Sequence, residues 1–227
     1  MKQLVLDLGA EHVPSLDTFE VGQNAELAHL MHQFAQRTSR ERFAYLWGES
    51  AAGKTHLLQG LAATPASRYI GPGGSREDFT YAPEVSLYLL DDCNLLSPDA
   101  QIDAFALFNQ IREHGAYMVS TGPVPPAVLP VREDLRTRMG WGLIYQIHGL
   151  SDEEKIAALT HAAEARGLTL SASVLPYLLS HFKRDMRSLS TMLDALDHYS
   201  LETQRPVTLP LLRDLLLNAN PQVESKE

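Results

Sequence analysis

The residues with the clearest chemical meaning lie in one segment, which reads G-E-S-A-A-G-K-T from Gly48 to Thr55. It satisfies every fixed position of G-x-x-x-x-G-K-[ST], a pattern in which backbone N–H groups of a glycine-rich loop surround a phosphate. In this pattern Lys54 neutralises the β- and γ-phosphate oxygens, and the Thr55 hydroxyl coordinates Mg²⁺ at a helix N-terminus. The segment therefore predicts a nucleotide-phosphate site, with contacts from Gly48, Ala52, Gly53, Lys54, Thr55 and His56.

A pair of acidic residues, Asp91 and Asp92, follows the apolar run from Val85 to Leu90. A buried strand that ends in acid places a carboxylate near the metal ion of a phosphate-binding loop. Asp91 is the candidate Mg²⁺ ligand. Asp92 stands where many ATPases have a glutamate that orients the attacking water, and its shorter side chain leaves hydrolysis by this chain open. Without the neighbouring phosphate-loop motif, the pair is equally consistent with two solvent-exposed acidic side chains at the end of a strand.

The elements around these residues alternate between strands and helices. A helix with Asn24 as its predicted cap carries apolar residues at helical spacing. Strands that alternate with helices indicate a three-layer α/β domain with a mostly parallel sheet, which we assign to residues 16–150. The predicted strands are 43–47, 68–70, 85–90, 117–119 and 143–147, and the predicted helices include 56–63 and the region of 102–109.

The pattern becomes entirely helical after residue 150. Ser151 and Glu154 form a capping-box pattern at the start of the first helix. We assign residues 151–218 to a small all-α domain, with residues 1–15 as an extended arm and 219–227 as a flexible tail. Further helices are predicted from Ser171 or Ser173 to Leu179, over 185–199 and over 209–217.

Composition narrows the functional classes. The chain has 227 residues, of which 44% are hydrophobic and 21% charged, and these values exclude collagen-like and disordered proteins. A net charge of −9 argues against a protein that grips nucleic acid through its phosphates. No apolar run is long enough to cross a bilayer, and the N-terminus does not resemble an export signal. Cys93 is the single cysteine, so the chain cannot form an internal disulfide bond. We therefore expect a cytoplasmic protein without a membrane partner.

The order of these features resembles that of AAA+ P-loop NTPases, specifically the nucleotide-binding part of the bacterial initiator DnaA, over residues 16–217. The segment with Phe19, Val21, Gly22 and Asn24 resembles the F-x-V-G-x-x-N entry of that family. The resemblance implies that this segment encloses adenine and that Val21 and Gly22 contact the nucleotide. It also implies an all-α lid domain after the α/β domain.

Three further positions take their predicted roles from the same resemblance. Thr121 resembles the sensor-1 residue, although Pro123 stands where the family often has aspartate. Arg138, in L-R-T-R-M-G-W-G, resembles an arginine finger that acts in trans, and Arg187 resembles the phosphate-facing residue of sensor 2. Without the resemblance, Arg138 fits a surface arginine paired with Glu133 or Asp134, and Arg187 fits a salt-bridging helix residue.

The layout resembles that of the Hda family, free-standing paralogues of the initiator. Ten residues follow Leu217, too few for the initiator's DNA-binding domain, and little room exists for a strand-binding insertion. The segment Q-L-V-L-D-L at residues 3–8 resembles the Q-L-x-L-x-L peptide that binds the DNA polymerase sliding clamp. In an extended chain Leu4, Leu6 and Leu8 share one face while Gln3 makes polar contacts. Alone, this segment also fits a strand packed on its own domain.

We therefore expect a replication regulator that holds ADP or ATP with Mg²⁺ and docks on the sliding clamp, the β subunit of DNA polymerase III. Arg138 would stimulate hydrolysis of DnaA-bound ATP and so inactivate the initiator. DNA would be contacted only through the clamp, and the chain is a possible homo-oligomer. Two alternatives remain open, a self-hydrolysing AAA+ ATPase such as a replication loader and a non-catalytic adaptor between initiator and clamp.

Overall fold

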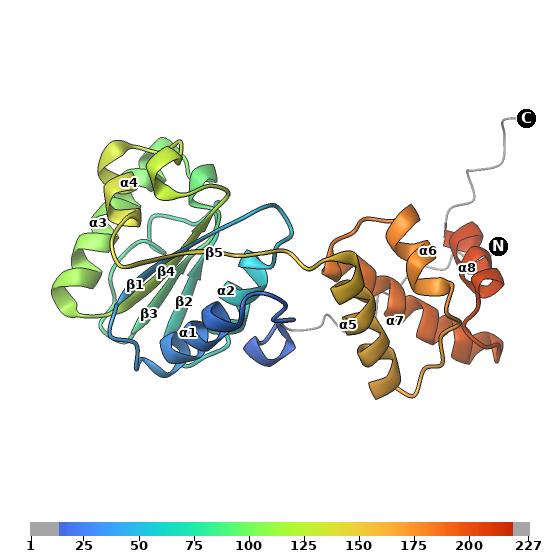
Figure 1. The fold of residues 1–227 in the computed structure, drawn as a ribbon. Helices are drawn as coiled ribbons and strands as arrows, with labels where there is room; N and C mark the ends of the chain where they lie inside the picture. The colour runs from blue at the N-terminus through green and yellow to red at the C-terminus, as the bar shows by residue number, and fades with distance from the viewer. Residues whose placement is uncertain (1–13, 220–227) are drawn as a thin grey trace, which may run out of the picture. The chain divides into compact units, whose positions relative to one another are not determined.

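The computed structural model describes residues 14–219, which divide into two compact units (Figure 1). The first unit ends at Gly149 and the second begins at Leu150. The predicted clamp-binding residues Gln3, Leu4, Leu6 and Leu8 and the tail from residue 220 lie outside the described residues. Within residues 14–219, no helix has both the length and the apolar character that a membrane span requires.

The first unit is built on one parallel sheet. Five strands lie within residues 14–149 in the order β2-β3-β4-β1-β5, and every pairing between neighbours is parallel. Because all five strands are parallel, the carboxyl ends of β1, β3 and β4 lie at the same edge of the sheet. The strands are β1 (Phe43–Trp47), β2 (Ser67–Ile70), β3 (Leu87–Leu90), β4 (Tyr117–Gly122) and β5 (Leu143–Gln146).

Helices cover both faces of this sheet (Figure 1). In β3, Leu87 and Leu89 belong to the core beneath α1 and α2, while Tyr88 and Leu90 belong to the core beneath α3 and α4. A strand buried on both faces needs no polar alternation, which explains its continuous apolar sequence. The helices are α1 (Ala25–Gln36), α2 (Lys54–Ala62), α3 (Pro98–His114) and α4 (Glu133–Met139), with short 3₁₀ turns η1 (Leu16–Thr18), η2 (Cys93–Leu95) and η3 (Pro126–Val128).

The predicted three-layer α/β class is confirmed, with differences at individual elements. Strand β4 ends at Gly122, three residues beyond the predicted strand, because the residues after Val119 continue the parallel pairing with β1. The short helix α4 was not predicted. The first helix begins after Asn24 as predicted, but the Asn24 side chain makes no capping hydrogen bond.

The C-terminus of α1 is held by an arginine with many hydrogen bonds. Arg37 has a left-handed backbone (φ 59°), and its guanidinium donates to the carbonyl oxygens of Phe34 and Ala35 at 2.9 and 2.6 Å. It also donates to the Pro65 carbonyl at 2.8 Å and to the Ser86 hydroxyl at 3.0 Å. Burial lowers the pKa of Arg37. This side chain therefore joins α1 to the segments that enter β2 and β3.

Replacement of Arg37 by methionine is expected to lower the free energy of unfolding by about 1–3 kcal/mol, because two half-buried carbonyl oxygens and one exposed carbonyl oxygen lose a charged donor. Methionine retains most of the apolar stem, so the loss reports the hydrogen bonds. Urea denaturation followed by circular dichroism measures the change. Arg40→Met, at a nearby exposed arginine, is the matched control. Equal stability of the two variants would contradict the role given to Arg37.

The second unit is a four-helix arrangement within residues 150–219. The predicted capping box is present, because the Ser151 hydroxyl accepts from Glu154 N at 3.2 Å and the Glu154 carboxylate accepts from Ser151 N at 2.7 Å. Arg166 and Asp194 pair across this unit. The core is leucine-rich. The helices are α5 (Asp152–Ala165), α6 (Val174–His181), α7 (Met186–Thr203) and α8 (Leu209–Ala219), as the helical assignment of this segment predicts.

Candidate nucleotide-binding site

The glycine-rich loop connects β1 to α2, as its sequence pattern requires. Gly53 has φ +105°, and a β-carbon at this position would lie 2.9 Å from the Phe19 ring. Both features favour glycine, which lets the backbone turn sharply into the first turn of α2. The helix begins at Lys54, with Thr55 in its first turn, so that its free N–H groups face the loop.

Lys54 lies beneath this loop and is 8% exposed. Its Nζ donates to the carbonyl oxygens of Gly48 and Glu49, each at 2.8 Å. Burial lowers the pKa of Lys54, while the nearby carboxylates of Asp92 and Asp91 act in the opposite direction. An ammonium group has three N–H donors, so one remains for a phosphate oxygen while the other two hold the loop.

Three strand ends meet at Asp91, which is 2% exposed. Its Oδ1 accepts from the Thr121 hydroxyl at 2.5 Å, and its Oδ2 accepts from the Tyr69 hydroxyl at 2.7 Å. Thr121 Oγ1 also accepts from Asp92 N at 2.9 Å. The candidate metal residue Asp91 and the candidate sensor Thr121 are thus in direct contact. Tyr69 was missed by the sequence analysis, and its place next to the end of a predicted strand was the available signal.

The donor types at this edge of the sheet fit a magnesium nucleotide. Thr55 and Asp91 supply hard oxygen atoms, and Mg²⁺ takes one or two such protein ligands and completes its shell with phosphate oxygens and water. Among the described residues, no group of three or more His, Cys, Asp or Glu side chains forms a metal site of its own.

Asp92 immediately precedes η2 and has a left-handed backbone, with φ 44° and ψ 53°. Asparagine and aspartate tolerate this conformation better than other residues with a β-carbon. Burial and the Asp91 charge raise the pKa of Asp92, and Lys54 partly offsets them. The folded protein therefore penalises the ionised form of Asp92.

Asp92→Asn is expected to raise stability at neutral pH, by less than about 1 kcal/mol because the side chain is only half-buried and partly screened. The raised pKa means that the native state disfavours the carboxylate. The gain is thus present above the native pKa of Asp92 and disappears as pH falls below its unfolded value. Thermal unfolding at several pH values measures the difference, and a gain that grows toward low pH would contradict this explanation.

The entry segment packs against α2 and the residues after β5. The Asn24 amide donates to the His148 carbonyl and accepts from His148 N, both at 2.8 Å, which replaces its predicted capping role. His56 Nε2 lies 3.1 Å from the Ser15 carbonyl oxygen and 3.2 Å from Thr18 Oγ1. These two contacts join α2 to the entry segment. Val21, in contrast, is 39% exposed and Gly22 is also exposed, so both are accessible to a ligand.

Arg138, the candidate finger, lies in α4 on the face of the sheet opposite α2 (Figure 1). Its guanidinium carbon is 4.0 Å from the centre of the Trp141 ring and 4.9 Å from that of Phe105. Its Nε donates to Asn109 Oδ1 at 3.1 Å. No carboxylate within residues 14–219 forms an ion pair with it, and the neighbouring Asp134 pairs with Arg132.

Arg187 belongs to the second unit, where it is the second residue of α7 and is exposed. The Asp185 carboxylate accepts from Ser188 N at 2.8 Å and so caps this helix. The cap fixes the first turn of α7, which carries the candidate sensor-2 residue.

A family model and solved structures match the two units. Residues 152–216 match the family described as "Hda, lid domain". Domain III of the replication initiation protein DnaA from Thermotoga maritima has a TM-score of 0.72 and 22% identity, over 89% of this chain and 95% of that one. AMPPCP-bound DnaA from Aquifex aeolicus has a TM-score of 0.69 and 21% identity, over 85% of this chain and 67% of that one.

The fold is also similar to that of RuvB. A mutant RuvB from Thermotoga maritima matches with a TM-score of 0.66 and 14% identity, over 91% of this chain and 73% of that one. The structural matches show that this chain shares the fold of DnaA domain III and RuvB, and residues 152–216 are similar to the Hda lid domain. The chain is therefore similar to DnaA domain III in its fold and to the Hda lid domain over residues 152–216.

Proposed function

We propose that this DnaA-related AAA+ protein inactivates the initiator by stimulating hydrolysis of DnaA-bound ATP while it is docked on the DNA polymerase sliding clamp. The observation that carries the proposal is the position of Arg138. It lies on the opposite face of the sheet from the α2 helix of the chain's own phosphate loop, and it has no acidic partner within the described residues. A guanidinium presented in this way is suited to stabilise charge on a nucleotide held by a neighbouring AAA+ protein.

The proposal assigns a different role to the chain's own nucleotide. The buried Lys54 and the Asp91–Thr121 contact supply a phosphate and magnesium site for ADP or ATP. Two DnaA structures that share this fold are described as bound to AMPPCP. With Arg187 as the lid contact and Val21 and Gly22 near the adenine, the resident nucleotide, in our proposal ADP, orders the two domains for docking. It is not consumed as fuel.

Clamp docking is assigned to the arm at residues 3–8, through Gln3, Leu4, Leu6 and Leu8. The proposed arm links inactivation to active synthesis, because it brings Arg138 to the initiator only where a clamp is loaded. DNA is then contacted through the clamp, in agreement with the net charge of −9. The cytoplasmic setting of the replication machinery is part of the same proposal.

The arm is tested with DnaA that carries prebound ATP, in the presence of DNA-loaded clamp. The intact protein is expected to convert this ATP to ADP, and a variant with alanine at Gln3, Leu4, Leu6 and Leu8 is expected to lose the conversion. A matched control changes Leu201, an exposed leucine of the lid, to alanine. Conversion that is equal with and without clamp would contradict the docking step.

One observation favours a second candidate, a self-hydrolysing AAA+ ATPase such as a replication loader. Lys54, Asp91 and Thr121 form a contiguous set of the type that hydrolysis requires, with the Asp92 backbone held by Thr121. Asp92 is shorter than the usual glutamate, so we expect weak turnover by the isolated protein. Multiple turnovers of its own ATP would favour this candidate. A non-catalytic adaptor would instead bind initiator and clamp without changing hydrolysis.

A further inference from the structure

The Asp91 carboxylate accepts a hydrogen bond at each of its two oxygen atoms, from hydroxyl groups on two different strands. Its Oδ1 accepts from the Thr121 hydroxyl of β4 at 2.5 Å, and its Oδ2 accepts from the Tyr69 hydroxyl of β2 at 2.7 Å. Asp91 is 2% exposed, and a carboxylate removed from water needs donors of this kind. Thr121 already has a predicted role as a sensor, whereas the proposed function assigns none to Tyr69.

The register of the sheet brings Tyr69 to this carboxylate. Tyr69 pairs with Leu89 in the parallel ladder. The next and last pair, Ile70 with Leu90, directly precedes Asp91. Asp91 N then donates to the Ile70 carbonyl oxygen at 2.9 Å, which holds the end of β3 against β2. Because the Tyr69 ring also packs against the core beneath α1 and α2, the point from which its hydroxyl reaches Asp91 is fixed.

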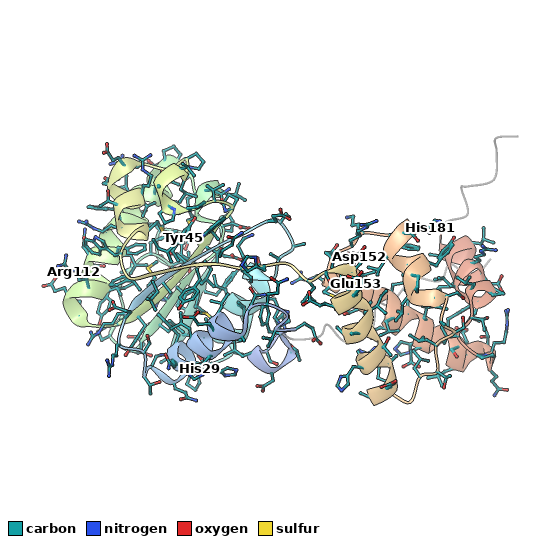
Figure 2. The ribbon with its side chains drawn as sticks, in the orientation of Figure 1. His29, Tyr45, Arg112, Asp152, Glu153 and His181 are labelled. Atoms are coloured by element: carbon teal, nitrogen blue, oxygen red, sulfur yellow. The ribbon has the colours of Figure 1, made fainter. Side chains whose placement is uncertain are left out.

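The face of the sheet on which a tyrosine lies decides which group its hydroxyl reaches. Tyr45 of β1, labelled in Figure 2, belongs to the core beneath α3 and α4, and its hydroxyl donates to the Val124 carbonyl oxygen at 2.9 Å. Tyr69 lies on the opposite face, which is covered by α1 and α2. The phosphate loop leads into α2, so Tyr69 approaches Asp91 from the side of the sheet that carries the predicted phosphate site.

A carboxylate rotates readily about the bond to its side-chain carbon, because this torsion has only broad minima. Donors on both oxygens remove that freedom, so the Tyr69 and Thr121 hydroxyls together fix the plane of the Asp91 carboxylate. Each carboxylate oxygen has two acceptor sites, and Tyr69 occupies one of those on Oδ2. The second site can face Mg²⁺ or one of its water ligands.

We infer that Tyr69 is a positioning residue for Asp91, because its hydroxyl holds the carboxylate in one orientation and thereby strengthens Mg²⁺ binding at the nucleotide site. This inference rests on the nucleotide site of the proposed function, but not on the stimulation of DnaA. Loss of a group that hydrogen-bonds a metal ligand typically lowers metal affinity by about 10- to 100-fold. Tyr69 thus acts on the metal ion through Asp91 and needs no contact with the nucleotide.

Tyr69→Phe tests this role, because it removes the hydroxyl and keeps the ring. Isothermal titration of the full chain with ADP, in excess EDTA and at increasing MgCl₂, separates metal binding from nucleotide binding. We expect the half-saturating Mg²⁺ concentration to rise about 10-fold, while the Kd for ADP in EDTA stays within about twofold of wild type. Tyr117→Phe is the matched control, because it removes a tyrosine hydroxyl that donates to the Arg37 and Ser39 carbonyl oxygens, at 2.8 and 3.2 Å, instead of to the site.

Asp91→Asn provides a second test, because the effect of Tyr69 passes through Asp91. In this background Tyr69→Phe should change the Mg²⁺ requirement by less than about twofold. Equal Mg²⁺ requirements of wild type and Tyr69→Phe would overturn the positioning role, and so would a full effect of Tyr69→Phe in the Asp91→Asn protein.

The EDTA measurement distinguishes positioning from a purely structural role. A loss of ADP affinity in EDTA as large as the loss in MgCl₂ would show that Tyr69 only maintains the fold, and would overturn the inference. Wild-type protein that binds ADP without any response to Mg²⁺ would overturn the magnesium site and the inference together. Absence of DnaA stimulation would instead overturn the proposed function and leave the Tyr69 result standing.

Discussion

Arg138→Ala is expected to return hydrolysis of DnaA-bound ATP to the initiator's own rate, a loss on the order of 10³-fold or more if the finger acts in trans. The guanidinium would supply charge stabilisation that forms only in the transition state, so the maximal rate should fall while affinity for the initiator changes little. Arg138→Lys should remain strongly impaired, because an ammonium group lacks the planar fork. Single-turnover conversion of prebound ATP measures both effects.

The control for this substitution is Arg76→Ala. Arg76 is 88% exposed and lies 3.7 Å from Asp103, so its removal changes the net charge of the same unit by an equal amount. Nucleotide binding should be unchanged in both variants. If Arg138→Ala and Arg76→Ala stimulate hydrolysis equally, Arg138 is not the finger.

Lys54→Ala is expected to weaken binding of ADP and ATP at least about 100-fold, since it removes a charge-assisted contact with the phosphates. The Gly48 and Glu49 carbonyl oxygens also lose the ammonium group that holds the loop. If the resident nucleotide orders the docking surface, stimulation of the initiator should fall as well. Isothermal titration with ADP and the single-turnover assay measure the two consequences separately.

Lys183→Ala makes the same substitution at an exposed lysine of the lid and serves as the control. A Lys54→Ala protein that binds ADP normally would contradict the assignment of the phosphate site. If the Lys54→Ala protein no longer binds nucleotide but still stimulates the initiator fully, then stimulation does not require the resident nucleotide. That result would contradict the role given to this nucleotide.

Much of the fold was predictable because local chemistry determines it. The limits of β1 were given by an apolar run that ends in glycine, and the start of α5 by a capping box. The three-layer class followed from the alternation of strands and helices. Asn24 was predicted to cap the helix that follows it, which is a local interaction. In the structure its side chain instead bonds to the backbone of His148, 124 residues away in sequence, and the local sequence pattern does not indicate this contact.

In the candidate site too, the sequence predicted the residues of a local motif but not those that depend on long-range packing. The phosphate loop is a contiguous motif, so Gly53, Lys54 and Thr55 could be named from sequence. The hydroxyl of Tyr69 and the amide of Asn109 could not, because their roles depend on which strands and helices become neighbours. The i, i+4 spacing of Phe105 and Asn109 was visible, but nothing in the sequence placed Arg138 against that face. Long-range packing therefore determined the parts that the sequence did not predict.

In the proposed function the hydrolysed nucleotide belongs to the initiator, and differential loading of the two proteins tests this most directly. ATP labelled at the γ-phosphate is bound either to DnaA or to this protein, with unlabelled nucleotide on the other partner, before DNA-loaded clamp is added. We predict rapid release of label from DnaA and only slow release from this protein. Rapid release from this protein, with label on DnaA retained at the initiator's own slow rate, would contradict the account and favour a self-hydrolysing ATPase.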